Sequence, residues 1–97
     1  MRPSEILASN RDAVLAIFAK YPKLVNPRVF GSVASGQDTE LSDIDFLVDD
    51  LPQATLFDLG GLYVELNELL GVNVDVVTPG DLPQKFRDIV IKEAVPL

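Results

Sequence analysis

Two strand-like runs separated by one leucine-rich helix most constrain the fold of this chain. Residues 44–48 (IDFLV) and 72–77 (VNVDVV) are rich in β-branched and aromatic residues, which favour strands. Between them, residues 55–70 repeat leucine at helical spacing and are followed by Gly71, a common helix-ending residue. This order predicts two strands side by side, with the helix packed against them.

Further elements flank this unit. Residues 4–20 carry an apolar stripe at helical spacing, interrupted at Asn10-Arg11, and residues 82–93 have an amphipathic pattern. Residues 28–30 form a short β-type run, and residues 34–41 predict a loop with room for one helical turn. The order α-β-β-α-β-α predicts an α/β fold, a small mixed sheet with helices on one face. We expect a single domain spanning residues 1–97.

The helix over residues 55–70 has clear start and packing signals. Thr55 and Asp58 have the spacing of a capping box. Gly60 and Gly61 each cost about 1 kcal/mol relative to alanine inside a helix, which predicts close packing there. The predicted buried face consists of Leu56, Leu59, Leu62, Tyr63, Leu66, Leu69 and Leu70.

Composition limits the chemistry that the chain can perform. It has no cysteine and no histidine, so acid–base and metal chemistry must use carboxylates, which select hard cations such as Mg²⁺. The formal net charge is −7, which disfavours nucleic acid as a partner and suits a basic protein. No signal-peptide core or membrane-length apolar run is present, so we expect a cytoplasmic protein that does not bind membranes.

Three aspartates are predicted to meet on one face of the sheet. Side chains alternate along a strand, so Asp43 and Asp45 project to the same side, opposite Ile44. With the two strands side by side, Asp75 joins them. Clustered carboxylates repel one another unless they take up protons or hold a cation. One or two Mg²⁺ ions with a substrate phosphate would resolve this repulsion.

Gly31-Ser32 lies at the end of the run 28–30, where glycine lets a phosphate approach the backbone. The small residues that follow can begin a short helix whose N–H groups face an anion. Taken alone, a Gly-Ser pair is usually only a turn, and Ser42-Asp43 is usually a helix cap or a loop. An exposed sheet face would also tolerate Asp75. Only the combination of these features is diagnostic.

That combination resembles the signature of the DNA polymerase β-like nucleotidyltransferase superfamily, in which Gly-Ser is followed at this spacing by Asp-x-Asp. The stretches GSVASGQDTELSDIDFLV, LFDLGGLYVELNELLGVNVDVVTP and IVIKEAVPL are similar to its minimal nucleotidyltransferase (MNT) branch. The resemblance covers essentially the whole chain. It is therefore more specific than any of its motifs alone.

The resemblance implies an activity and a site. Asp43, Asp45 and Asp75 would be the catalytic and metal-binding carboxylates, and Gly31, Ser32 and Ser42 would bind the nucleotide. The implied reaction transfers a nucleoside monophosphate, AMP from ATP, to a protein hydroxyl with Mg²⁺. MNT proteins commonly act as antitoxins of HEPN-type ribonuclease toxins, which implies a HEPN-type partner and a hetero-oligomer.

One position departs from the family pattern. Many relatives have arginine where this chain has Ser35, and loss of a cation near the phosphates weakens triphosphate binding or transition-state stabilisation. Arg28, Lys85 or Arg87 are candidates to replace it. The departure keeps open a non-catalytic antitoxin that neutralises its partner by stoichiometric binding. Transfer to a small molecule resembling an aminoglycoside is a further alternative.

Overall fold

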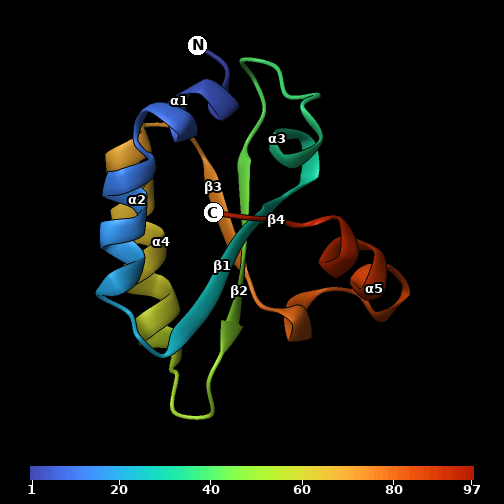
Figure 1. Cartoon of the computed structure of the whole chain (residues 1–97). Helices are drawn as coiled ribbons and strands as arrows, with labels where there is room; N and C mark the ends of the chain where they lie inside the picture. The colour runs from blue at the N-terminus through green and yellow to red at the C-terminus, as the bar shows by residue number, and fades with distance from the viewer.

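The computed structural model describes residues 1–97 and contains a four-stranded sheet in the order β3-β2-β1-β4. β1 (Leu24–Phe30) and β2 (Ile44–Asp50) are antiparallel, whereas β3 (Val74–Val77) runs parallel to β2. β4 (Val95–Pro96) pairs antiparallel with β1. The sheet is therefore mixed, as predicted, and α4 (Leu56–Leu70) connects its two parallel strands (Figure 1).

The N-terminal helices lie with α4 on one side of the sheet (Figure 1). The single helix predicted over residues 4–20 is wrong in one respect, because the structure has α1 (Pro3–Ser9) and α2 (Arg11–Ala19). The break falls at Asn10, whose backbone leaves the helical region. Its side-chain Nδ2 donates to the carbonyl of Ile6 at 2.8 Å, so a local polar contact replaces continuous helix.

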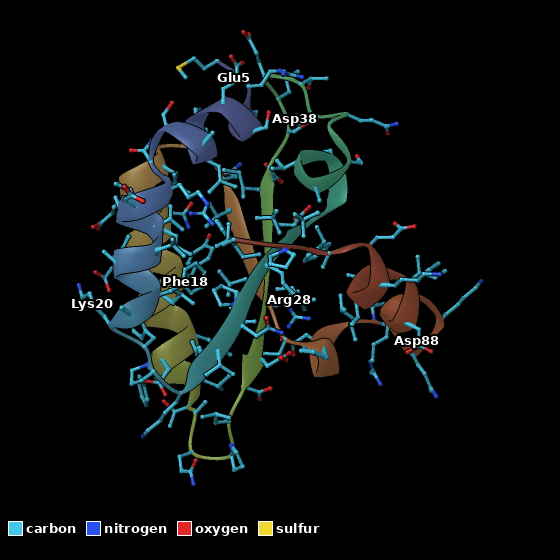
Figure 2. The ribbon with its side chains drawn as sticks, viewed as in Figure 1. Glu5, Phe18, Lys20, Arg28, Asp38 and Asp88 are labelled. Atoms are coloured by element: carbon cyan, nitrogen blue, oxygen red, sulfur yellow. The ribbon has the colours of Figure 1, made fainter.

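The hydrophobic core fills the space between these helices and the sheet. Ile44, Phe46 and Val48 face the helices, as strand alternation predicted. Phe18 of α2 packs edge-to-face on Phe46 with ring centroids 5.7 Å apart (Figure 2). The other buried members of the cluster are Leu7, Val14, Leu24, Val29, Val33, Leu62, Leu66, Leu70 and Val74.

The predicted signals that start and end α4 are confirmed. The Thr55 amide donates to the Asp58 carboxylate at 2.8 Å, and the Asp58 amide donates to the Thr55 hydroxyl at 3.3 Å. At the other end Gly71 adopts a left-handed φ of 67°. Close packing is confirmed at Gly61, where an added Cβ would lie 2.7 Å from the Tyr21 hydroxyl oxygen, whereas Gly60 faces open space.

The predicted buried face of α4 is too wide. Leu56 is 84% exposed and Tyr63 is 45% exposed. Both lie outside the narrower buried row Leu62, Leu66 and Leu70. The longest helix has only 15 residues, and none of the helices combines the length and apolar character needed to span a membrane.

The remaining elements lie away from the helical layer. α3 (Gly31–Ser35) follows β1 directly, and a single 3-10 turn (Pro79–Asp81) precedes α5 (Gln84–Glu93). α5 begins two residues later than the predicted 82–93, and none of its residues is buried. It stands beside the sheet in Figure 1. The sequence did not predict β4, since two residues including a proline give no periodic pattern.

Candidate nucleotide and metal site

Asp45 and Asp75 lie side by side at the start of the two parallel strands. The register pairs the Cα atoms of Ile44 with Val74 and of Asp45 with Asp75. Because each aspartate follows a buried residue in its strand, both side chains leave the sheet on the face opposite the core. Asp43 is the residue directly before β2 and is exposed. The parallel pairing therefore brings Asp45 and Asp75 together, with Asp43 two residues away in sequence.

Asp45 also lies against Gly31. The backbone of Gly31 has a φ of 72°, and an added Cβ would lie 3.4 Å from the carboxyl carbon of Asp45 and closer still to its Oδ2. The antiparallel register explains this approach, since Phe30, the residue before Gly31, is the Cα partner of Asp45. Glycine is required here both for its backbone conformation and for the space that the carboxylate takes.

The electrostatic environment of Asp45 disfavours its charged form. Partial burial raises the pKa of the Asp45 carboxyl above its ordinary value, and the charges of Asp75 and Asp43 raise it further. Asp43 and Asp75 are both exposed. A carboxylate that is half-buried among like charges gains from a nearby cation.

The chain alone does not form a complete metal cage. No group of three or more Asp, Glu, His or Cys side chains is arranged to hold a metal ion. Mg²⁺ characteristically takes one or two protein carboxylates together with substrate phosphates and water. Asp45 and Asp75 fit that pattern, because they offer hard oxygen donors from two neighbouring strands.

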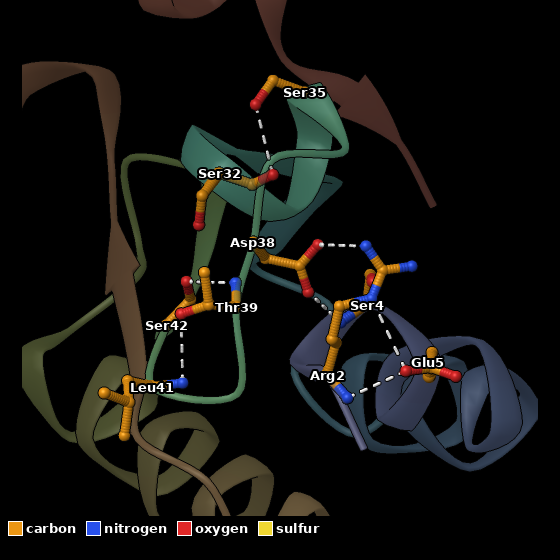
Figure 3. A network of polar contacts seen from close by, with 9 residues as sticks. All are labelled: Arg2, Ser4, Glu5, Ser32, Ser35, Asp38, Thr39, Leu41 and Ser42. Atoms are coloured by element: carbon orange, nitrogen blue, oxygen red, sulfur yellow. Dashed lines mark hydrogen bonds and ion pairs between the residues drawn. The ribbon is translucent and has the colours of Figure 1, made fainter.

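The predicted Gly-Ser turn opens α3, a five-residue helix that ends at Ser35 and is capped by Gly36. The Ser35 hydroxyl donates to the carbonyl of Ser32 at 3.2 Å (Figure 3). A cavity of about 690 Å³ lies beside this turn. It is lined by Gly31, Ser32, Ala34, Ser35, Gln37 and Glu93.

Ser42 belongs to the loop that connects the turn to Asp43. Its hydroxyl oxygen accepts the Thr39 amide at 2.9 Å, and it is not among the residues that line the cavity (Figure 3). The buried Asp38 carboxylate accepts the Ser4 amide at 2.8 Å and lies 3.9 Å from Arg2 Nη1, which attaches the same loop to α1. In the structure Ser42 closes a loop turn.

The three candidate replacement cations all lie outside this cavity. Arg28 is buried and donates from Nη2 to Asp49 at 2.6 Å (Figure 2). Arg87 donates to the carbonyl of Leu82 at 3.1 Å, and Lys85 lies over the Phe86 ring. Sequence reasoning also missed Glu93, which lines the cavity. Its position depends on the pairing of β4 with β1, and the sequence of β4 carries no pattern that predicts a strand.

A model of the nucleotidyltransferase domain matches residues 12–97, which include all the elements described for the site. The chain belongs to this nucleotidyltransferase family. The resemblance inferred from the Gly-Ser and Asp-x-Asp motifs is thereby confirmed.

Relatives of this nucleotidyltransferase domain include proteins that are named protein adenylyltransferases. A candidate protein adenylyltransferase of Methanocaldococcus jannaschii, MJ0435, is 42% identical over 67 residues, covering 69% of this chain and 72% of the relative. The protein adenylyltransferase MntA of Thermococcus cleftensis is 37% identical over 67 residues, covering 69% and 68%.

Solved structures confirm the minimal nucleotidyltransferase fold. A candidate minimal nucleotidyltransferase is 44% identical to this chain with a TM-score of 0.84, covering 97% of this chain and 95% of the other. A chain from the crystal structure of a toxin–antitoxin with AMP-PNP has a TM-score of 0.74 at 23% identity, covering 90% and 71%. At that identity the second likeness shows the fold alone.

Proposed function

We propose that this domain transfers AMP from ATP, with Mg²⁺, to a hydroxyl group of a partner protein. The observation that carries the proposal is the pairing of Asp45 with Asp75 next to Gly31. The protein adenylyltransferase relatives support a protein as the acceptor. The partner that fits the MNT resemblance is a HEPN-type toxin. A chain of the same fold from a toxin–antitoxin structure supports a toxin as the partner, without naming its class.

The chain's residues have separate roles in the proposed reaction. Gly31 and Ser32 would receive the triphosphate, and Asp45 and Asp75 would hold the metal, with Asp43 beside them in sequence. Bound Mg²⁺ would neutralise charge that develops on the phosphate oxygens. The acceptor oxygen bonds to the α-phosphorus as the bond from phosphorus to the bridging oxygen breaks, and pyrophosphate leaves. The hydroxyl proton passes to a carboxylate, for which the exposed Asp75 is the candidate.

The test is incubation with ATP labelled at the α-phosphate, Mg²⁺ and the product of the neighbouring gene. The wild-type chain should label the partner, and Asp43→Asn plus Asp45→Asn should reduce labelling at least about 100-fold. The matched control is Asp12→Asn plus Asp88→Asn, two exposed acids outside the site that change net charge equally. Labelling that survives the site variant shows that the mechanism is wrong.

A second candidate is a non-catalytic antitoxin that neutralises its partner by stoichiometric binding. The absence of any Lys or Arg from the cavity favours it, because transition-state charge on a triphosphate is normally met by cations. It predicts full neutralisation by the double aspartate variant and no transferred label. Neutralisation that is lost together with labelling favours the enzyme instead.

A further inference from the structure

The cavity beside the Gly-Ser turn contains one charged residue, and that residue is acidic. Five of its six lining residues lie between Gly31 and Gln37, and the sixth is Glu93. None of the chain's eight Lys and Arg residues lines it. Asp43, Asp45 and Asp75 do not line it either. A triphosphate placed in this cavity would therefore meet the negative charge of Glu93 and no compensating side-chain cation.

The fold fixes Glu93 in this position. Glu93 is the last residue of α5, and β4 follows one residue later. β4 pairs Val95 with Val29, close to the end of β1, and β1 leads directly into Gly31. The pairing carries the end of α5 to the turn, as the chain path below α3 shows in Figure 1.

Glu93 is not neutralised by a neighbour. It is exposed and takes part in none of the five ion pairs of the chain. Lys92, its neighbour in sequence, is absent from the cavity lining. The carboxylate is thus available to act on whatever enters the cavity.

We propose that Glu93 is a selectivity residue that makes the cavity reject free triphosphates and accept metal-chelated ones. The inference rests on the proposed nucleotide site. A triphosphate and Glu93 repel each other, and a divalent cation bound to the phosphates cancels part of that repulsion. Glu93 thereby couples nucleotide binding to metal binding, although no ligand need contact its carboxylate directly.

The test measures binding of a fluorescent, non-hydrolysable ATP analogue to the full chain, with Mg²⁺ and with EDTA. Glu93→Gln should tighten metal-free binding by about 10-fold and Mg²⁺-loaded binding by about 3-fold. The control is Asp88→Asn, which removes the same charge from an exposed position of α5 outside the cavity and should change either affinity less than about 2-fold.

A second variant changes the charge of the same cavity by adding a cation instead of removing an anion. Ser35→Arg adds a cation to the lining without altering Glu93, and it should also strengthen metal-free binding more than Mg²⁺-loaded binding. The gain in affinity for the ATP analogue should become smaller in both variants as the salt concentration is raised, because salt screens exposed charges.

Two outcomes overturn the proposal, and they differ in what else they reject. Equal effects of Glu93→Gln and Asp88→Asn, in a chain that binds the analogue, overturn the role of Glu93 and leave the nucleotide site intact. No binding by any of these proteins, even with Mg²⁺, overturns the role of Glu93 and the proposed function together.

Discussion

The Asp45 carboxylate lies against the α-carbon of Gly31, so that the first metal-site candidate and the phosphate-turn candidate touch. A Cβ on Gly31 would sit 3.4 Å from the carboxyl carbon of Asp45. Asp45 lies in β2, and Gly31 directly follows Phe30, the Cα partner of Asp45 at the end of the antiparallel strand β1. Any ligand held by one of them is therefore within reach of the other.

Gly31→Ala should abolish nucleotide binding, because the added Cβ displaces the Asp45 carboxylate. The positive φ alone costs about 1–2 kcal/mol for an L-residue. Gly36→Ala is the matched control, since Gly36 has a similar φ of 76° and nothing within 4 Å of an added Cβ. Both variants should lose stability in urea denaturation, and only Gly31→Ala should lose binding. Equal binding by the two would contradict the contact.

Asp45→Asn should stabilise the metal-free fold at pH 7. Burial and the charges of Asp75 and Asp43 raise the pKa of Asp45 in the folded state. A raised carboxyl pKa contributes stability below the unfolded pKa and loses it as pH rises through the folded pKa. We expect a Tm gain of about 2–4 °C at pH 7, kept small by solvent screening, and none near pH 3.

The measurement is thermal unfolding with EDTA at both pH values. Addition of Mg²⁺ with the ATP analogue should raise the Tm of the wild-type chain and leave Asp45→Asn unchanged. If Asp45→Asn raises the Tm equally at pH 3 and pH 7, the charge of Asp45 is not the cause of the gain.

Arg28→Gln should lower stability without weakening nucleotide binding. Arg28 is buried, donates to Asp49 and to the carbonyl of Asn26, and does not line the cavity. Loss of charged hydrogen bonds of this kind costs about 1.5–3 kcal/mol. The free energy of unfolding from urea titration and the affinity for the ATP analogue should separate the two effects. A large loss of affinity in the folded variant would instead assign Arg28 to the phosphates.

The two adjacent glycines of α4 should respond oppositely to alanine. Gly60→Ala places a Cβ in open space and should stabilise the helix by about 0.5–1 kcal/mol. Gly61→Ala places one 2.7 Å from the Tyr21 hydroxyl oxygen, which is hydrogen-bonded to Glu65, and should destabilise the fold. Urea titration of both variants checks the difference, and stabilisation by both would show that Tyr21 moves freely.

Features that depend on neighbouring residues followed from the sequence. The capping pair Thr55 and Asp58 acts within one helical turn, and side-chain alternation put Asp45 on the face opposite the buried Ile44, whatever the strand pairs with. The apolar stripe over residues 4–20 predicted one helix. The side chain of Asn10 instead donates a hydrogen bond to a backbone carbonyl, and the helix is divided there. Local periodicity therefore predicted where helices and strands occur more reliably than where they begin and end.

Tertiary structure decided which distant residues meet. Asp45 touches Gly31 because β1 and β2 pair in one register, Arg28 is taken by Asp49 across the sheet, and Glu93 reaches the turn through β4. Such contacts depend on how whole strands pair with one another. No local sequence pattern determines which residues of two strands are paired. The sequence by itself determined the carboxylates available for chemistry, because it contains neither histidine nor cysteine. Only the folded chain decided the charge of the cavity beside the Gly-Ser turn, because its one charged residue, Glu93, comes from a distant part of the sequence.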